Sequence, residues 1–230
     1  MIDPENITRY NLTKHGLEEN LFFWVMVSGK TADVVAPQCN RLLKRAREKT
    51  GLKRAGTFDV MRAYREKSAV FVKTLLDIDV EPHEMIHTPN PVGIRHLLRV
   101  HGIGCHGMKS QAVEELIDSN LNLATCSLSD LTNIYGIALK TASCFILHTR
   151  ADSDVSGLDT HMLAEIRSRG YRGVPKSTPA NVKTYEKWSL VVKKMAAEAG
   201  MTMPQFDLAI FTKRHRKVGR DKNGKLAKVK

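Results

Sequence analysis

A lysine and an aspartate stand where they could act together on one reacting bond. Lys140 opens one apolar-periodic segment, and Asp159 precedes another, with a polar loop between them. A neutral lysine amine can attack an electrophilic carbon and form an imine, and a nearby carboxylate can stabilise positive charge in the transition state. The two residue types and their order therefore indicate covalent catalysis, provided that the fold brings both side chains into one cleft.

The elements that must position this pair are predicted between residues 131 and 166 as helix, tight turn, helix, loop and helix. Gly136 gives the chain the backbone freedom to leave the short first helix. The second helix opens near Leu139 and carries enough apolar residues for a buried face. The segment 150–157 is polar and is predicted to be a loop. Asp159 has the residue type and position of an N-cap for the third helix.

This arrangement resembles the helix-hairpin-helix DNA glycosylase superfamily. The family's hairpin pattern is matched by Leu131, Ile134, Gly136, Ile137, Ala138, Lys140 and Ala142, with Ala138 in place of a second glycine. Lys140 stands where bifunctional members keep their nucleophilic lysine, and Asp159 where they keep their aspartate. The later segments are most similar to the compact archaeal-type 8-oxoguanine DNA glycosylase/AP lyases, and the resemblance covers roughly residues 20–215.

The resemblance also implies DNA contacts and a base pocket. In this family the hairpin turn and a nearby histidine contact phosphates, while loops of the first lobe face the target strand and wedge into the duplex. The positions that match these DNA-binding roles are Gly136, Ala138, Thr141, His161, Lys30 and His106. The flipped base enters a pocket whose final aromatic residue is commonly Trp. Here that residue is Phe211, and Asp207 precedes it in the same segment.

The fold class predicted from periodicity is all-α, because no alternating run of β-branched residues is long enough to require a sheet. The resemblance adds two helical lobes, with the hairpin and the active-site cleft between them. We expect an N-terminal arm over residues 1–20 and a glycosylase-like domain over 21–215, with the hairpin at about 131–147. Residues 216–230 form a basic, flexible tail in this prediction.

The chain carries a formal net charge of +12 over 230 residues, which favours a polyanionic partner. Much of this charge is local, since the segment 213–230 holds nine basic residues against a single acid. Such a tail is either a solvated end or an aid to non-specific DNA binding, and the two interpretations coexist. Double-stranded DNA is the expected partner, and a monomer is the default state.

No metal or organic cofactor is expected. The four cysteines are scattered without a C-x-x-C pair, which argues against a disulfide framework, a zinc site and an iron–sulfur cluster. Neither a signal peptide nor an 18-residue apolar span is apparent, so the sequence predicts an intracellular protein that does not bind membranes, in the cytoplasm or nucleoid or in a nucleus.

The predicted function is base-excision repair by a DNA glycosylase/AP lyase that removes 8-oxoguanine from duplex DNA through a lysine imine. Two alternatives stay open. An enzyme on the same scaffold, such as a phage-type transferase acting on activated modified thymine, could hypermodify bases with the same two residues. A non-enzymatic DNA-binding module could use only the hairpin and tail, with Lys140 an ordinary surface lysine and Asp159 a simple N-cap. A nucleotide-hydrolysing site at Lys30 is disfavoured, because the upstream glycine of a phosphate loop is missing.

Overall fold

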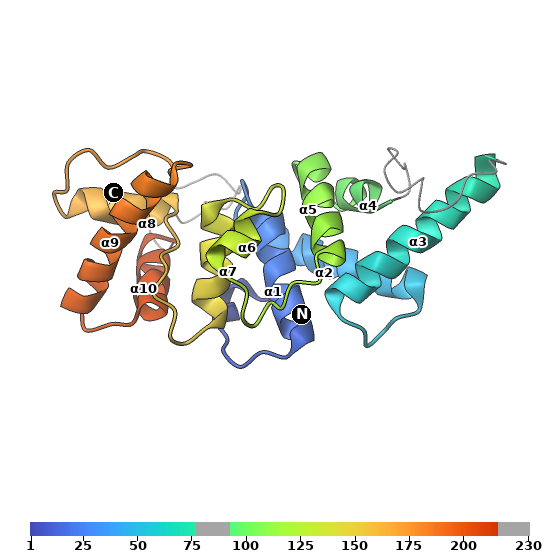
Figure 1. Cartoon of the computed structure of the whole chain (residues 1–230), viewed down its shortest axis with the longest axis horizontal. Coiled ribbons are helices and arrows are strands. Elements are labelled where there is room, and N and C mark those ends of the chain that lie inside the picture. The colour runs from blue at the N-terminus through green and yellow to red at the C-terminus, as the bar shows by residue number, and fades with distance from the viewer. Residues whose placement is uncertain (77–92, 216–230) are drawn as a thin grey trace, which may run out of the picture. The chain divides into compact units, whose positions relative to one another are not determined.

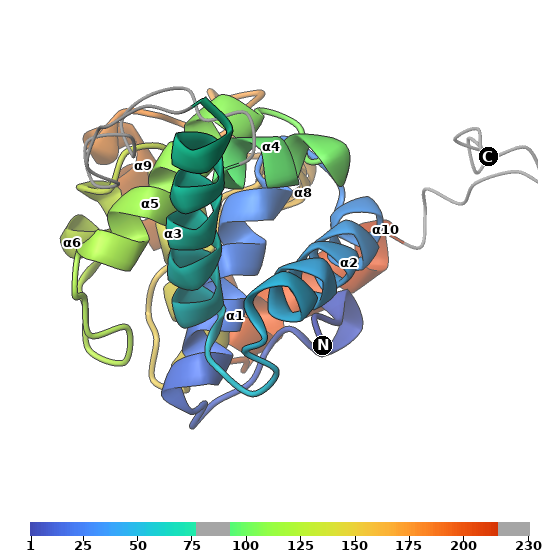
Figure 2. The same ribbon diagram turned by 90° about the vertical axis from the view of Figure 1, so that its right-hand side faces the viewer.

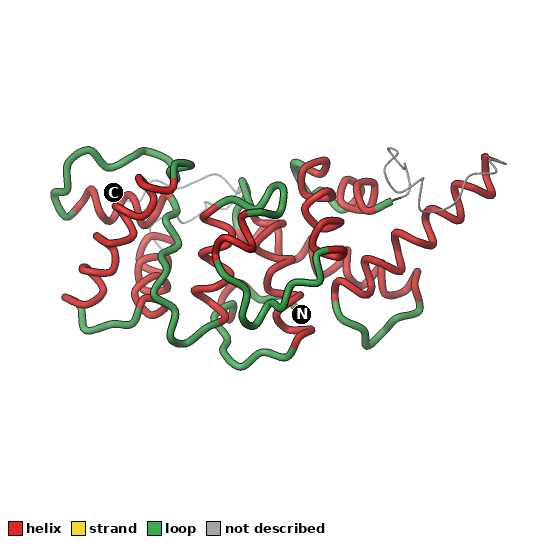
Figure 3. Tube along the Cα trace, in the orientation of Figure 1, coloured by secondary structure: helices red, strands yellow, loops and turns green. Residues whose placement is uncertain are grey.

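The computed structural model describes the backbone of residues 1–76 and 93–215 and the side chains of residues 1–70 and 93–213. Residues 77–92 and the predicted tail at 216–230 lie outside these ranges. Within them all regular structure is helical and no strand is present (Figure 3). The prediction of an all-α fold is therefore confirmed for the described part of the chain.

The chain divides into two compact units, Met1–Ile137 and Ala138–Lys230. The boundary falls inside the predicted hairpin, between its turn and its second helix. The predicted site residues are split accordingly. Lys30, His106 and Gly136 belong to the first unit, and the remaining ones belong to the second.

The first unit is built around one buried helix. Its elements are η1 (Pro4–Asn6), α1 (Lys14–Val27), α2 (Ala32–Thr50), α3 (Thr57–Leu76), α4 (Ile94–Val100), α5 (His106–Asp118) and α6 (Leu128–Thr132). Helix α1 packs against α2, α3 and α5 (Figures 1 and 2). Leu21, Phe22 and Met26 are fully buried and belong to a continuous apolar run at residues 21–27. The helix begins at Lys14, because the hydroxyl of Thr13 accepts a hydrogen bond from Gly16 N and caps it.

The first hairpin helix, α6, begins at Leu128 rather than at the predicted Leu131. A reciprocal capping box sets this start: the Ser127 hydroxyl accepts from Asp130 N, and the Asp130 carboxylate accepts from Ser127 N. The helix then ends at Thr132, and Leu131 is fully buried. The predicted short first helix is present, but it begins three residues earlier in the chain.

The second unit contains α7 (Leu139–Thr149), α8 (Thr160–Ser168), α9 (Val182–Glu198) and α10 (Met203–His215). Helix α10 packs against α7, α8 and α9, which makes it the shared partner of the unit. Trp188, Val192 and Met195 from α9 meet Leu163 and Phe206 in one apolar core. This core fixes the two helices from which the candidate catalytic residues project.

A buried carboxylate also ties α8 to α10. Glu165 on α8 is 3% exposed, and its carboxylate pairs with Lys213 Nζ at 3.3 Å and with Arg169 Nε at 3.3 Å. Lys213, the first residue of the basic C-terminal segment, therefore belongs to α10 rather than to a tail. A buried carboxylate needs such partners, since an unpaired one is costly.

Candidate active site

Lys140 and Asp159 lie close enough in the second unit for the charge of one to act on the other. Lys140 stands in the first turn of α7, and Asp159 is the N-cap of α8. Asp159 Oδ1 accepts a hydrogen bond of 2.7 Å from Met162 N, as the sequence predicted for an N-cap. The cap fixes the direction of the carboxylate through Oδ1.

The pKa of Asp159 is raised above its ordinary value. Burial is the first cause, and the negative charge of Asp207 is the second. The Met162 N–H, Lys140 and His161 act in the opposite direction, but they do not cancel the first two effects. Asp159 is therefore a carboxylate that binds a proton more readily than an exposed aspartate and that feels the charge of Lys140.

The loop that carries Asp159 is held by two hydroxyl groups. Tyr185 Oη donates a hydrogen bond of 2.6 Å to Ser156 O and accepts one of 3.2 Å from Leu158 N. Thr178 Oγ1 donates to Leu158 O at 2.7 Å. Tyr185 is 3% exposed, and burial raises the pKa of its phenol, so it stays a hydroxyl. Tyr185 was not among the predicted site residues, and its hydroxyl positions the loop.

Gly157 allows this loop to pass directly against its neighbours. A Cβ atom at Gly157 would lie 3.0 Å from Cys144 Sγ and 3.3 Å from Asp207 Oδ1. A side chain here would displace the thiol on α7 or the carboxylate on α10. Burial raises the pKa of Cys144 to about 12, so the group that faces the loop is a neutral thiol.

Two site neighbours were missed by the sequence analysis, Cys144 and His148. Both are buried on α7, four and eight residues after Lys140 in the printed sequence, so the three lie on one helix face. His148 Nε2 lies 3.4 Å from Asp207 Oδ2, with the two side chains 4% and 18% exposed. Their spacing of four and eight residues from Lys140 could have placed them on its helix face. That spacing does not reveal which side chains of α10 and of the loop before α8 contact this face.

The predicted pocket residues lie on α10. Phe211 is half-buried, and its ring meets the ring of His161 edge-on, with centroids 5.8 Å apart and planes at 85°. Asp207 lies one turn earlier, beside His148 and Gly157. The second unit thus brings together five of the predicted residues: Lys140, Asp159, His161, Asp207 and Phe211.

Of the two glycines in the family's hairpin pattern, the structure requires a glycine only at residue 136. Gly136 has φ +78°, and a Cβ there would lie 2.9 Å from Met108 Cγ, so both backbone and space require glycine. Ala138, the N-cap of α7, has φ −87°, which any residue adopts. Thr141, in the first turn of α7, is only 4% exposed, and its contact with DNA stays a prediction.

Lys30 and His106 lie in the first unit. Lys30 is exposed in the turn between α1 and α2, and its Cε lies 3.0 Å from the Cβ position of Gly104. His106 is the first residue of α5 rather than part of a loop, following Cys105 in the left-handed conformation (φ 52°). Their contact with DNA stays a prediction.

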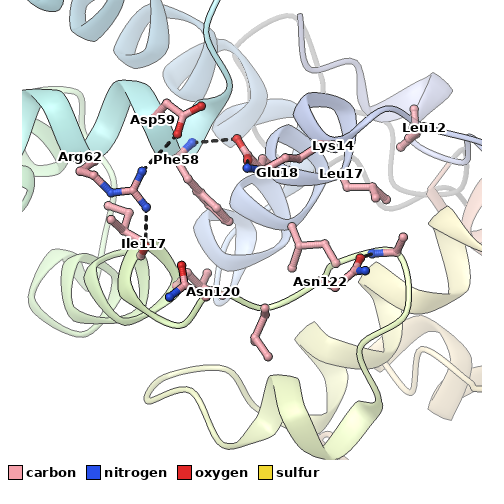
Figure 4. Close-up of a pocket in the computed structure, with 14 residues that line it drawn as sticks. Leu12, Lys14, Leu17, Glu18, Phe58, Asp59, Arg62, Ile117, Asn120 and Asn122 are labelled. Carbon is pink, nitrogen blue, oxygen red and sulfur yellow. Dashed lines mark hydrogen bonds and ion pairs between the residues drawn. The ribbon is translucent and has the colours of Figure 1, made fainter.

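A cavity of about 450 Å³ lies elsewhere in the first unit (Figure 4). It opens between the starts of α1 and α3 and the end of α5. Its charged side chains bond to one another and to the backbone. Glu18 Oε2 accepts a hydrogen bond from Phe58 N at 3.0 Å, and Arg62 donates to Asp59 at 3.1 Å and to Ile117 O at 2.7 Å. The cavity does not include any predicted site residue.

Over the described ranges, the side chains form no group of three or more His, Cys, Asp or Glu residues that could hold a metal ion. Nor does that part of the chain contain a helix long and apolar enough to cross a membrane. The four cysteines are free, with Cys39, Cys126 and Cys144 buried and Cys105 exposed.

The fold is shared with two solved structures of an 8-oxoguanine DNA glycosylase. The 8-oxoguanine glycosylase/lyase of Methanocaldococcus jannaschii, in complex with a 15mer DNA containing 8-oxoguanine, superposes with a TM-score of 0.58 at 15% identity, over 91% of this chain and 86% of that one. A second structure of the 8-oxoguanine DNA glycosylase from that organism gives a TM-score of 0.57 at 16% identity, over 90% and 81%. No family model and no curated protein matches the sequence. The chain thus has the fold of an 8-oxoguanine DNA glycosylase.

Proposed function

We propose that this protein is a DNA glycosylase with AP lyase activity, which removes an oxidised purine, 8-oxoguanine, from double-stranded DNA. The observation that carries the proposal is the placement of Lys140 within charge range of a partly buried, N-capping Asp159 whose pKa is raised. A lysine nucleophile needs a proton acceptor beside it, and a carboxylate with a raised pKa is a better acceptor than an exposed one.

In the proposed reaction, the Lys140 ammonium gives a proton to Asp159, and the freed Nζ bonds to C1′ of the damaged nucleotide. The C1′–N9 bond breaks, and its electron pair leaves with the base, which takes the proton from Asp159. The carboxylate, ionised again, faces the positive charge on the sugar. Ring opening yields an imine between Nζ and C1′. Loss of a C2′ proton then expels the 3′ phosphate and cleaves the strand.

DNA binding in this proposal uses both units. The start of α7 has no side-chain cap from Ala138, so its first-turn N–H groups suit a phosphate. Gly136 shapes the turn before it, His161 contacts a neighbouring phosphate, and Lys30 and His106 contact DNA from the first unit. Phe211 and Asp207 line the base pocket. The net charge of +12 and the DNA complex of the structural neighbour support a DNA substrate.

Borohydride trapping tests the proposal directly, because reduction of the imine leaves a covalent protein–DNA adduct. The substrate is a duplex with one 8-oxoguanine opposite cytosine. We expect an adduct with the wild-type protein, none with Lys140→Gln, and strongly reduced trapping with Asp159→Asn. Lys183→Gln is the matched control, since Lys183 is an exposed lysine in the first turn of α9 and should trap normally.

The other outcomes separate the alternatives. Trapping at an abasic site but not at 8-oxoguanine would retain the lyase and exclude this substrate. Absence of trapping on both duplexes would exclude the glycosylase/lyase and favour a base-modifying enzyme, whose DNA product gains mass without strand cleavage. DNA binding that is unchanged in Lys140→Gln, without any product, would indicate a binding module.

A further inference from the structure

His148 and Asp207 form a largely buried pair that takes no part in the bond-making and bond-breaking steps of the proposed reaction. His148 projects from α7 and Asp207 from α10, and the separation of Nε2 and Oδ2 is 3.4 Å. Their side chains are only 4% and 18% exposed, so water screens the pair weakly. The pair lies at the end of the α7 face that begins with Lys140, two helical turns away.

Within the pair, Asp207 is the residue that acts on Asp159. Its Oδ1 lies 3.3 Å from the Cβ position of Gly157, two residues before Asp159, so it packs against the loop that carries the candidate catalytic carboxylate. It is also the largest charged influence on the pKa of Asp159, which it raises. Two carboxylates this close disfavour each other's ionisation unless a cation or donor balances one of them.

The remaining titratable groups around Asp159 are Lys140 and Cys144 on α7, His161 on α8 and Tyr185 on α9. Cys144 and Tyr185 stay neutral because burial raises the pKa of both. Lys140 and His161 lower the pKa of Asp159, and His148 contacts Asp207 at 3.4 Å. Through this contact His148 can act on Asp159 by way of Asp207.

We infer that His148 is a positioning residue, whose imidazole balances the charge of Asp207 and so keeps the carboxylate of Asp159 ionised beside Lys140. Without His148, the full charge of Asp207 opposes ionisation of Asp159, and the proton acceptor for Lys140 is lost at pH values where the wild type still has it. Asp207 meanwhile holds its place against Gly157 only while a partner compensates its desolvation.

The test is an NMR titration of the Asp159 carboxyl carbon, in the full chain without DNA, with the signal assigned by its loss in Asp159→Asn. His148→Gln keeps an amide donor but cannot carry charge. We expect the Asp159 titration midpoint to move to higher pH in His148→Gln and to lower pH in Asp207→Asn. In the double variant we expect the midpoint of Asp207→Asn alone, because His148 then has no charge to balance.

Charge balance predicts that the Asp159 midpoint shifts in opposite directions in the two single variants and that the double variant matches Asp207→Asn. Equal shifts in both single variants, or an unshifted midpoint in His148→Gln, would overturn the inference and leave His148 a packing residue. If His148→Gln alone does not fold, addition of Asp207→Asn should restore folding, because it removes the unpaired carboxylate. Failure of this rescue would also overturn it.

The catalytic meaning of the pair rests on the proposed function, but the titration does not. If borohydride trapping succeeds, the acid limb of single-turnover base release should move to higher pH in His148→Gln and to lower pH in Asp207→Asn. If trapping fails on every substrate while the midpoints shift as expected, the charge balance stands and the glycosylase assignment falls.

Discussion

Substitution of Asp159 should separate its two structural roles, as a helix cap and as a partly buried charge. Asp159→Asn removes the charge but keeps an amide oxygen that can accept from Met162 N, and Asn caps helices about as well as Asp. Asp159→Ala removes both. The difference in unfolding free energy between the two variants therefore reports the cap, and the difference between wild type and Asp159→Asn reports the charge.

The cap contributes about 1 kcal/mol, so we expect Asp159→Ala to be less stable than Asp159→Asn by that amount. In a chain of this size, 1 kcal/mol corresponds to about 2–4 °C in Tm. The charge acts in the other direction. Because the folded protein raises the pKa of Asp159 above its ordinary 3.8, the ionised carboxylate opposes folding. We expect Asp159→Asn to be more stable than wild type at neutral pH, although it should trap DNA poorly.

The sign of the pH dependence follows from the same shift. Below pH 3.8 the carboxyl is protonated in folded and unfolded chains alike, so wild type and Asp159→Asn should be nearly equal in stability. The advantage of Asp159→Asn should grow as pH rises through the raised folded value and stay constant above it. Urea unfolding of the three proteins across this pH range, followed by circular dichroism, measures both differences.

Two results would refute this reasoning. If Asp159→Asn were less stable than wild type at neutral pH, ionisation of Asp159 would favour folding, and the carboxylate would not be the strained proton acceptor of the proposal. If Asp159→Ala and Asp159→Asn were equally stable, the 2.7 Å bond to Met162 N would not cap α8.

Three further substitutions test the supports of the site. Gly136→Ala should lower the unfolding free energy more than Gly170→Ala does. Both positions have positive φ, so backbone strain of about 1–2 kcal/mol is common to both, but only Gly136 also lacks space for a Cβ. Equal losses of unfolding free energy in urea would contradict the crowding at Gly136. Tyr185→Phe should cost about 1–3 kcal/mol, because Ser156 O loses a donor and Leu158 N–H loses one of its two acceptors, and faster hydrogen exchange of the Leu158 amide checks the cause. Glu165→Gln should lower stability by about 1–3 kcal/mol, with a loss that changes little in high salt because the carboxylate is buried; a loss abolished by salt would contradict this.

Local sequence determined the helices and their ends, because those depend on neighbouring residues. The buried character of α1 follows from its continuous apolar run, and the capping position of Asp159 from residue type before an apolar-periodic segment. Gly136 was placed correctly for the same reason, since only glycine readily adopts its φ. The start of α6 was misplaced because its capping box was not considered.

The sequence by itself also established the all-α class and, through the hairpin pattern, singled out Lys140 and Asp159. Only the tertiary structure decided what surrounds them. Packing of α10 against α7 brings Asp207 to His148 and to the loop of Asp159, across separations of about 50–60 residues that no local pattern encodes. Burial then sets the charge behaviour of Asp159 and Cys144, because desolvation depends on the complete set of neighbours and not on residue type or spacing.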